Sequence, residues 1–210
     1  MNTDTNRLLE AKEHFHGSDL EKIEKYFGIP KEQITAFGAN VNPLGISPCL
    51  RQGLARHIDA ITTYPDPDYT ELRGHIAGYA GCRPEEILVG NGCTELISLF
   101  IQIHRPKKAL IVSPTYSEYE REVTLSGGTV QYYALRETDD FQLDIEDFCR
   151  ELAGQAPDHC VICNPNNPTS TAVLPDGMRK ILECCQKQNI FVMIDETYAE
   201  FAPARTSVSA

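Results

Sequence analysis

The chain has 210 residues, of which 41% are hydrophobic and 23% charged, a composition typical of a globular protein with a sizeable core. Its formal net charge of −11 would repel nucleic acid and anionic membrane surfaces, so we expect neither as a partner. No apolar run approaches the ~20 residues that span a membrane, and the start lacks the regions of a signal peptide, which favours a cytoplasmic location.

Residues 1–65 differ in pattern from the rest of the chain. Amphipathic spacing predicts a helix at 18–28 and another near 49–60. Between them the chain is irregular and rich in Asn, Pro and Gly over 38–48, and a second turn-rich stretch follows at 63–69. We interpret residues 1–65 as an N-terminal arm with part of a small domain, extended over another part of the protein such as a second subunit.

Residues 66–210 alternate between helical patterns and short apolar runs. Strands that are apolar on nearly every residue, separated by helices, indicate an α/β domain with a mostly parallel sheet and helices on both faces. The expected helices lie at about 70–80, 93–104, 117–126, 144–153 and 175–188, and the expected strands at 86–90, 108–113, 129–135, 159–163 and 190–195.

The eight cysteines do not form the pattern of a disulfide framework. Cys160 and Cys163 make a lone CxxC on an expected strand, where residues three apart point to opposite faces. The pair could not easily share one metal ion, so we expect buried thiols and no metal site.

Polar residues follow the strand expected at 86–90, where parallel sheets bind ligands. The stretch "VGNGCTELI" turns into a helix near Cys93. The free amides of Gly92, Cys93 and Thr94, with the Thr94 hydroxyl, could form an anion site at the helix start. The alternative is an ordinary capped helix, with Asn91 or Thr94 as the cap.

Three further strand ends carry chemical side chains. Tyr116 could lie flat on a planar ligand, or pack as an ordinary tyrosine at a helix start. Asn167 stands in the rigid turn "CNPNNPTS" and offers both a donor and an acceptor to a ligand. The alternative is a plain Asn-Pro turn. Asp195 ends an apolar strand and needs a cationic partner or several donors. No basic residue lies nearby in sequence, so a ligand cation is expected, and Tyr198 could reach the same space.

Taken together, these residues fit a planar, phosphorylated heteroaromatic molecule with a ring nitrogen that must be protonated, as in pyridoxal 5′-phosphate (PLP). At these positions the sequence resembles the fold type I PLP enzymes of the class I/II aminotransferase superfamily. The motifs that carry the resemblance occur in the family's order: "YPDP", "NGCTE", "PTYSEY", "NPNNPT" and "DETYAEF".

The resemblance implies a role for each matching residue. Cys93 and Thr94 would hold the PLP phosphate, and Tyr116 would stack on the ring. Asn167 and Tyr198 would bind the 3′-oxygen, and Asp195 would pair with the protonated ring nitrogen. Tyr64 resembles the tyrosine that reaches the phosphate of a neighbouring subunit's PLP, which implies a homodimer.

Within the superfamily, the N-terminal part resembles the threonine-phosphate decarboxylases of cobalamin biosynthesis. The residues are "FHGSDL" (15–20), "YFGIP" (26–30) and "FGANVNPLGISP" (37–48). The resemblance implies decarboxylation of L-threonine O-3-phosphate to aminopropanol phosphate, with His16 and Asn42 near this small phosphorylated substrate. His16 could instead be a surface residue, and Asn42 part of a plain turn. Two alternatives stay open for the function: an aminotransferase of the histidinol-phosphate type, and a non-catalytic PLP-binding or interaction module.

The family also has a lysine that forms a Schiff base with the cofactor, a few tens of residues after the Asp-x-x-Tyr motif. The last lysine here is Lys187, which precedes Asp195 and falls, like Lys180, on the polar face of an expected helix. We therefore expect the 210 residues to be an N-terminal fragment, without the C-terminal part of the small domain and without turnover by itself.

Overall fold

The structure is a computed structural model that describes residues 19–35, 38, 40–42 and 44–202. The chain divides into two compact units, Met1–Pro65 and Asp66–Ala210, which are considered separately below. Within the described part of the chain, no helix is both long enough and apolar enough to cross a membrane.

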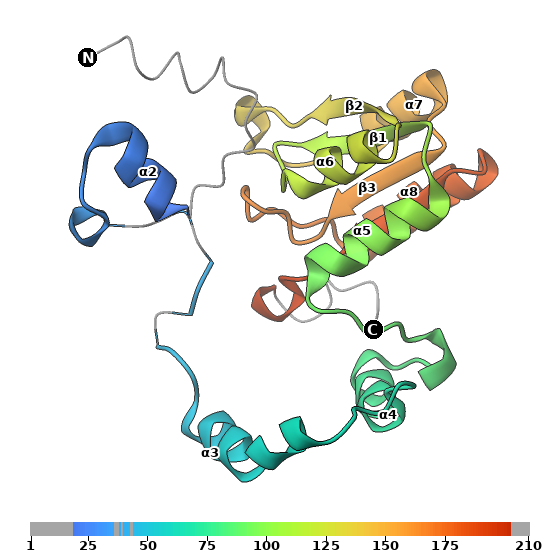
Figure 1. Ribbon diagram of the computed structural model, residues 1–210. Coiled ribbons are helices and arrows are strands. Elements are labelled where there is room, and N and C mark those ends of the chain that lie inside the picture. The colour runs from blue at the N-terminus through green and yellow to red at the C-terminus, as the bar shows by residue number, and fades with distance from the viewer. Residues whose placement is uncertain (1–18, 36–37, 39, 43, 203–210) are drawn as a thin grey trace. The chain divides into compact units, whose positions relative to one another are not determined.

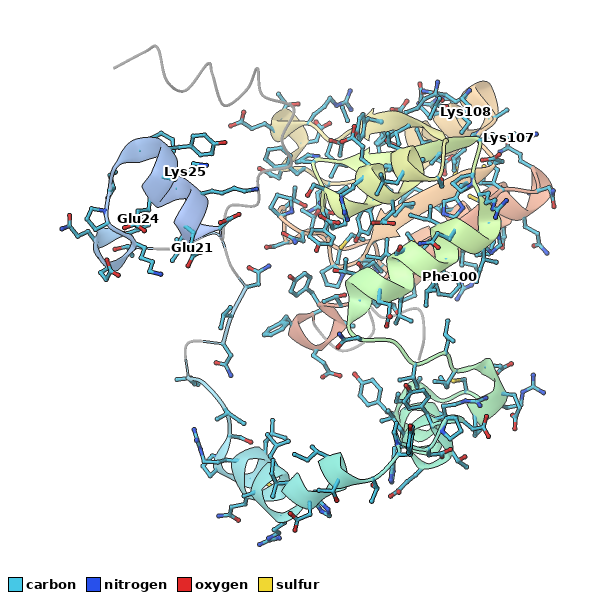
Figure 2. All side chains as sticks on the ribbon, viewed as in Figure 1. Glu21, Glu24, Lys25, Phe100, Lys107 and Lys108 are labelled. Carbon is cyan, nitrogen blue, oxygen red and sulfur yellow. The ribbon has the colours of Figure 1, made fainter. Side chains whose placement is uncertain are left out.

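The described residues of the first unit include two short helices, α2 (Leu20–Phe27) and α3 (Pro48–Arg56). Each has a side-chain cap, because Asp19 accepts from the backbone of Lys22 and Ser47 accepts from the backbone of Leu50. Neither helix contains a buried residue, and Figure 2 shows Glu21, Glu24 and Lys25 along α2. The same described part of the unit has two 3₁₀ helices, Lys31–Gln33 and Ile58–Thr62.

The second unit is built on a four-stranded parallel sheet with the strand order β2-β1-β3-β4 (Figure 1). This arrangement confirms the expected α/β class. The strands are β1 (Lys108–Ser113), β2 (Thr129–Ala134), β3 (His159–Cys163) and β4 (Phe191–Asp195). The helices are α4 (Thr70–Ala80), α5 (Cys93–His104), α6 (Glu118–Leu125), α7 (Ile145–Gln155) and α8 (Pro175–Lys187), with 3₁₀ helices at Pro84–Glu86, Glu137–Asp139 and Ala199–Phe201.

Helices cover both faces of the sheet. Since alternate strand residues point to opposite sides, each strand contributes side chains to both cores. Cys160 and Ile162 of β3 pack with residues of α7 and α8, whereas Val161 and Cys163 pack with residues of α5 and α6. The two cysteines of the CxxC motif therefore lie in different cores, as the strand periodicity predicts.

The prediction of a strand at 86–90 is wrong. The 3₁₀ helix Pro84–Glu86 takes its first residue, and 87–90 have no regular secondary structure. Leu88 is 53% exposed there. Apolar residues do not make a strand without a neighbouring strand to take up the backbone hydrogen bonds, and none of the four strands of the described sheet pairs with this segment.

The order of the strands indicates where a ligand could bind, at the carboxyl ends of β1 and β3. The chain leaves β1 for β2 on one side of it and later returns to β3 on the other side. This reversal separates the loops that follow β1 and β3, and ligands of open α/β sheets bind where such loops diverge. Lys107 and Lys108 mark the opposite, amino end of β1 (Figure 2).

His159 is the buried titratable group at that amino end. It is 1% exposed, its ring stacks on Phe191 with the centroids 5.2 Å apart, and its Nε2 has no hydrogen-bond partner among the described residues. Burial lowers the pKa of His159 from 6.5 to about 4, with a smaller contribution from His104 and an opposing one from Asp158.

We expect acid to destabilise the fold through His159. The unfolded chain takes up a proton near pH 6.5 and the folded chain only near pH 4, so stability falls as the pH drops between these values. The full loss is on the order of 3 kcal/mol, from 1.36 kcal/mol per pKa unit. Urea unfolding at a series of pH values would measure this loss. His159→Leu should flatten the slope between pH 5 and 6.5, whereas His104→Gln should leave most of it; an unchanged slope in His159→Leu would contradict the assignment.

Candidate active site

Asp195 is a buried carboxylate at the carboxyl end of β4, 8% exposed. Its Oδ2 accepts from the hydroxyl of Tyr119 at 2.6 Å and from the thiol of Cys93 at 3.4 Å. Its Oδ1 accepts from the backbone N–H and the hydroxyl of Thr197, at 2.9 and 2.6 Å. These donors are all neutral, so within the described chain the negative charge is solvated by hydrogen bonds and not balanced by a cation.

The start of α5 lies beside this carboxylate, through the contact of Cys93 with Asp195. The N-cap residue is Gly92, with a φ of 83° that favours glycine, and no described side chain caps the helix. The ordinary cap by Asn91 or Thr94 is therefore not what the structure has. Instead, the Glu95 carboxylate accepts from the backbone N–H of Asn91. The first turn of α5 thus presents backbone amides and the positive end of the helix dipole, which suits an anion.

Tyr116 follows β1 and reaches the same region. Its hydroxyl lies 3.3 Å from that of Thr94, and its ring meets the edge of Tyr119 with the centroids 5.7 Å apart. Tyr116 is therefore adjacent to both the start of α5 and the residue that holds Asp195. Tyr116 is only partly buried.

The turn after β3 is tied to the turn after β1 by a buried amide. Asn166 accepts from the hydroxyl of Thr115 at 2.9 Å and donates to the carbonyl of Pro114 at 2.9 Å. Asn164 exchanges two hydrogen bonds with Val173, at 2.8 and 3.2 Å. These bonds give the turn that carries Asn167 a defined conformation, and Asn167 itself is half-buried.

The thiols and phenol around Asp195 are held in their neutral forms. Burial raises the pKa of Cys93 to about 11, with a further contribution from the charge of Asp195. Burial also raises the pKa of Tyr119 well above its ordinary range, as do Cys163 and Asp195. The pKa of Cys163 is raised by burial as well, while the Tyr119 hydroxyl and the Asn167 amide oppose the shift. Each group therefore remains a hydrogen-bond donor at neutral pH.

The remaining candidate residues are placed less closely. Tyr198 precedes the 3₁₀ helix Ala199–Phe201, with its ring 6.4 Å from that of Phe201. Tyr64 and Asn42 belong to the first unit, where Tyr64 is fully exposed. Asn42 accepts a hydrogen bond from the backbone of Leu44 at 3.0 Å, as expected if it belongs to a plain turn. His16 lies outside the described residues.

Tyr119, Thr197 and Asn166 are site residues that the sequence reasoning missed. Tyr119 stands three residues after Tyr116 in "PTYSEY", in the first turn of α6, so its nearness to Tyr116 in sequence was the available signal. Thr197 stands two residues after Asp195, a spacing at which aspartate often binds the backbone of its own turn. No comparable local signal separates Asn166 from its neighbour Asn167.

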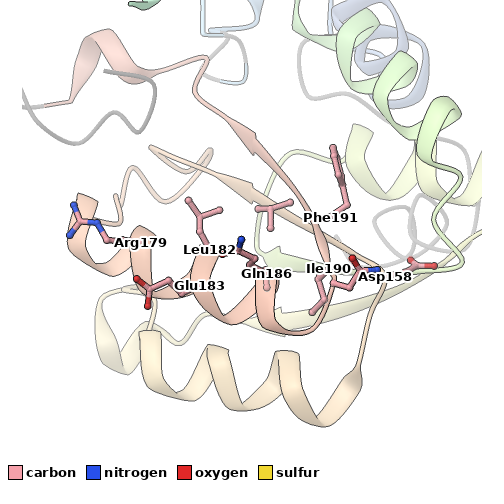
Figure 3. Close-up of a pocket in the computed structure, with 10 residues that line it drawn as sticks. Asp158, Arg179, Leu182, Glu183, Gln186, Ile190 and Phe191 are labelled. Atoms are coloured by element: carbon pink, nitrogen blue, oxygen red, sulfur yellow. The ribbon is translucent and has the colours of Figure 1, made fainter. Parts of the chain in front are cut away.

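A hollow of about 700 Å³ lies elsewhere on this unit, between α8 and β4 (Figure 3). Leu182, Ile190 and Val192 line it, and all three belong to the core on the α7 and α8 side of the sheet. Asp195 contacts Tyr119, which packs in the core on the α5 and α6 side. The hollow is therefore separate from the candidate active site.

The fold and the site together define an α/β protein in which a helix start that no described side chain caps lies beside a buried carboxylate. Comparison with known proteins agrees, because residues 32–210 match the family model described as aminotransferase class I and II. The chain belongs to this family. It is 34% identical over 193 residues to the threonine-phosphate decarboxylase of Salmonella typhimurium, covering 91% of this chain and 52% of that protein.

Solved structures show the same relationship. The histidinol-phosphate aminotransferase of Clostridium acetobutylicum superimposes with a TM-score of 0.72 at 30% identity, covering 81% of this chain and 50% of the other. The histidinol-phosphate aminotransferase of Sinorhizobium meliloti, solved in complex with pyridoxal-5′-phosphate, has a TM-score of 0.77 at 20% identity, covering 95% and 52%. The chain spans about half the length of the curated relatives it matches.

Proposed function

We propose that this chain forms the PLP-binding part of an enzyme of amino-acid and cobalamin metabolism. The observation that carries the proposal is Asp195, a buried carboxylate with neutral donors only, located beside a helix start that no described side chain caps. A carboxylate suits a protonated ring nitrogen, and the helix start suits a phosphate. When bound, PLP supplies an electron sink for the bonds at the substrate's α-carbon.

The chain's own residues have distinct tasks in this proposal. Gly92, Cys93 and Thr94 hold the phosphate at the start of α5, and Tyr116 stacks on the ring. Asp195 keeps the ring nitrogen protonated, which strengthens the sink. Asn167 and Tyr198 bind the 3′-oxygen, Tyr64 reaches the phosphate bound by the other subunit of a homodimer, and His16 and Asn42 lie near the substrate.

The proposed reaction is decarboxylation of L-threonine O-3-phosphate to aminopropanol phosphate, in the cytoplasm. Its support is the similarity to a threonine-phosphate decarboxylase over 91% of this chain. The second candidate is an aminotransferase, favoured by the structural likeness to a histidinol-phosphate aminotransferase at 30% identity. The protein groups that bind the substrate's carboxylate would decide between the two reactions, because they determine which bond at the substrate's α-carbon the electron sink weakens.

Several other parts of the proposal follow from the family. Residues 66–210 are the large, PLP-binding domain and residues 1–65 an arm with part of the small domain. The proposed activity is that of the whole protein, since the chain spans about half of its relatives. The 210 residues alone should have no turnover, because Lys180 and Lys187 are exposed on α8 and no lysine follows Asp195.

The test incubates the whole protein and, separately, residues 1–210 with PLP and either threonine phosphate or histidinol phosphate, with and without 2-oxoglutarate. Release of CO2 by the whole protein without consumption of 2-oxoglutarate supports the decarboxylase. Consumption of 2-oxoglutarate with histidinol phosphate supports the aminotransferase. PLP binding without either reaction would support the non-catalytic module. Turnover by residues 1–210 would contradict the expectation that they are inactive without a lysine that forms the Schiff base.

A further inference from the structure

Asp195 is held by donors of unequal strength. Oδ1 receives two bonds from Thr197, at 2.9 and 2.6 Å. Oδ2 receives the short bond from the Tyr119 hydroxyl, at 2.6 Å, and the bond from the Cys93 thiol, at 3.4 Å. A thiol is a weak donor, so Oδ2 has one strong partner and one that a better donor could replace.

Tyr119 is well suited to hold Oδ2 in place. It is 0% exposed, it belongs to the core between α5, α6 and the sheet, and the edge contact with Tyr116 packs its ring. A ring enclosed on these sides keeps a single orientation, and its hydroxyl reaches Asp195 from α6, an element separate from β4. A neutral phenol facing a carboxylate can only donate.

We propose that Tyr119 is a positioning residue that acts through Asp195. Its hydroxyl fixes the orientation of the carboxylate, stabilises the negative charge and keeps an acceptor position of Oδ2 available to a protonated ring nitrogen. The inference rests on the proposed PLP function and deepens it: Tyr119 touches neither substrate nor cofactor, and its effect is confined to ligands that carry the ring N–H.

The experiment compares two ligands in two variants. Pyridoxamine 5′-phosphate has an amine in place of the aldehyde, so it binds without a Schiff base and can be titrated against residues 1–210 and against the whole protein. Its 1-deaza analogue, in which a C–H replaces the ring nitrogen, cannot make the bond to Asp195. The dissociation constants of both ligands are measured by calorimetry for the unchanged protein, Tyr119→Phe and Tyr133→Phe.

Tyr133 provides the matched control. Its hydroxyl donates to Asp147 at 3.0 Å, and the ring is 8% exposed and packed edge-on against Phe148. Tyr133→Phe therefore removes the same atom from a second tyrosine–aspartate pair in the same unit, on the other face of the sheet, in which the tyrosine is buried and the aspartate is partly exposed. It should change the affinity for neither ligand.

The unchanged protein should bind pyridoxamine 5′-phosphate more tightly than the deaza analogue. Tyr119→Phe should lower the affinity for pyridoxamine 5′-phosphate by on the order of tenfold, as expected for one hydrogen bond to a charged group. The affinity for the deaza analogue should not change. The ratio of the two constants is read within one variant, so partial unfolding, which weakens both ligands equally, cancels.

Each outcome decides something. A ratio that is the same in Tyr119→Phe and in the unchanged protein would overturn the positioning role while PLP binding stands. Equal weakening of both ligands, or loss of both together with loss of structure, would make Tyr119 a structural residue only and also overturn the role. No binding of either ligand by the unchanged whole protein would overturn the proposed cofactor, and this inference with it.

Discussion

Asp195→Asn is expected to lower the affinity for pyridoxamine 5′-phosphate by about 150- to 5,000-fold, since removing one member of a buried charged pair costs about 3–5 kcal/mol. Asparagine preserves the size of the side chain and removes the charge. The donors from Tyr119 and Thr197 would then face a neutral amide, and a protonated ring nitrogen would have no counter-charge. Fluorescence or calorimetric titration of the whole protein measures the change.

Asp147→Asn is the control for this variant. Asp147 also accepts a hydrogen bond from a tyrosine, Tyr133, and pairs with Arg150 at 2.7 Å on the surface of α7. It lies away from the candidate site, so its replacement should leave the affinity unchanged. Equal losses in Asp147→Asn and Asp195→Asn, or no loss in Asp195→Asn, would show that the ring nitrogen does not bind here.

Phe148→Ala is expected to lower the free energy of unfolding of the second unit by about 3–5 kcal/mol. Phe148 is 0% exposed in the core between α7, α8 and the sheet, and its ring meets that of Tyr133 edge-on with the centroids 5.0 Å apart. Truncation removes apolar surface from this core and leaves a cavity. Urea denaturation followed by circular dichroism measures the change.

Leu125→Ala removes a large apolar side chain from the end of α6, where Leu125 is 68% exposed. Its stability should change by less than about 0.5 kcal/mol, because its side chain is mostly hydrated in the folded state as well. A loss in Leu125→Ala as large as that in Phe148→Ala would contradict the exposed position of Leu125.

The centre of the sheet could be predicted because β1 and β3 are buried on both faces. The runs at 108–113 and 159–163 are mostly apolar and match β1 and β3 residue for residue. The run at 86–90 is equally apolar, yet it is not a strand in the described chain. A strand depends on a partner as well as on its own residues, and local composition does not show whether a partner is present.

The candidate site was predictable in part for a similar reason. Asp195 ends a buried strand and Tyr116 follows one, and the polar residues at the carboxyl ends of parallel strands gather at one edge of the sheet. Cys93 follows the segment 86–90, which is not a strand, and reaches the same place at the start of α5. The structure brings these three together, through the Cys93–Asp195 contact and the packing of Tyr116 on Tyr119. The expectations for Tyr64, Asn42 and His16 remain predictions that rest on the family resemblance.

The sequence by itself determined the alternation of helices and buried strands, the acidic surface and the turns that carry the polar residues, because each depends on neighbouring residues along the chain. Only the tertiary structure decided which donors meet Asp195. Tyr119 and Cys93 are 76 and 102 positions away from it in sequence. Their contacts depend on the order of the strands and on which face each helix covers, and local hydrophobic periodicity does not encode either of these.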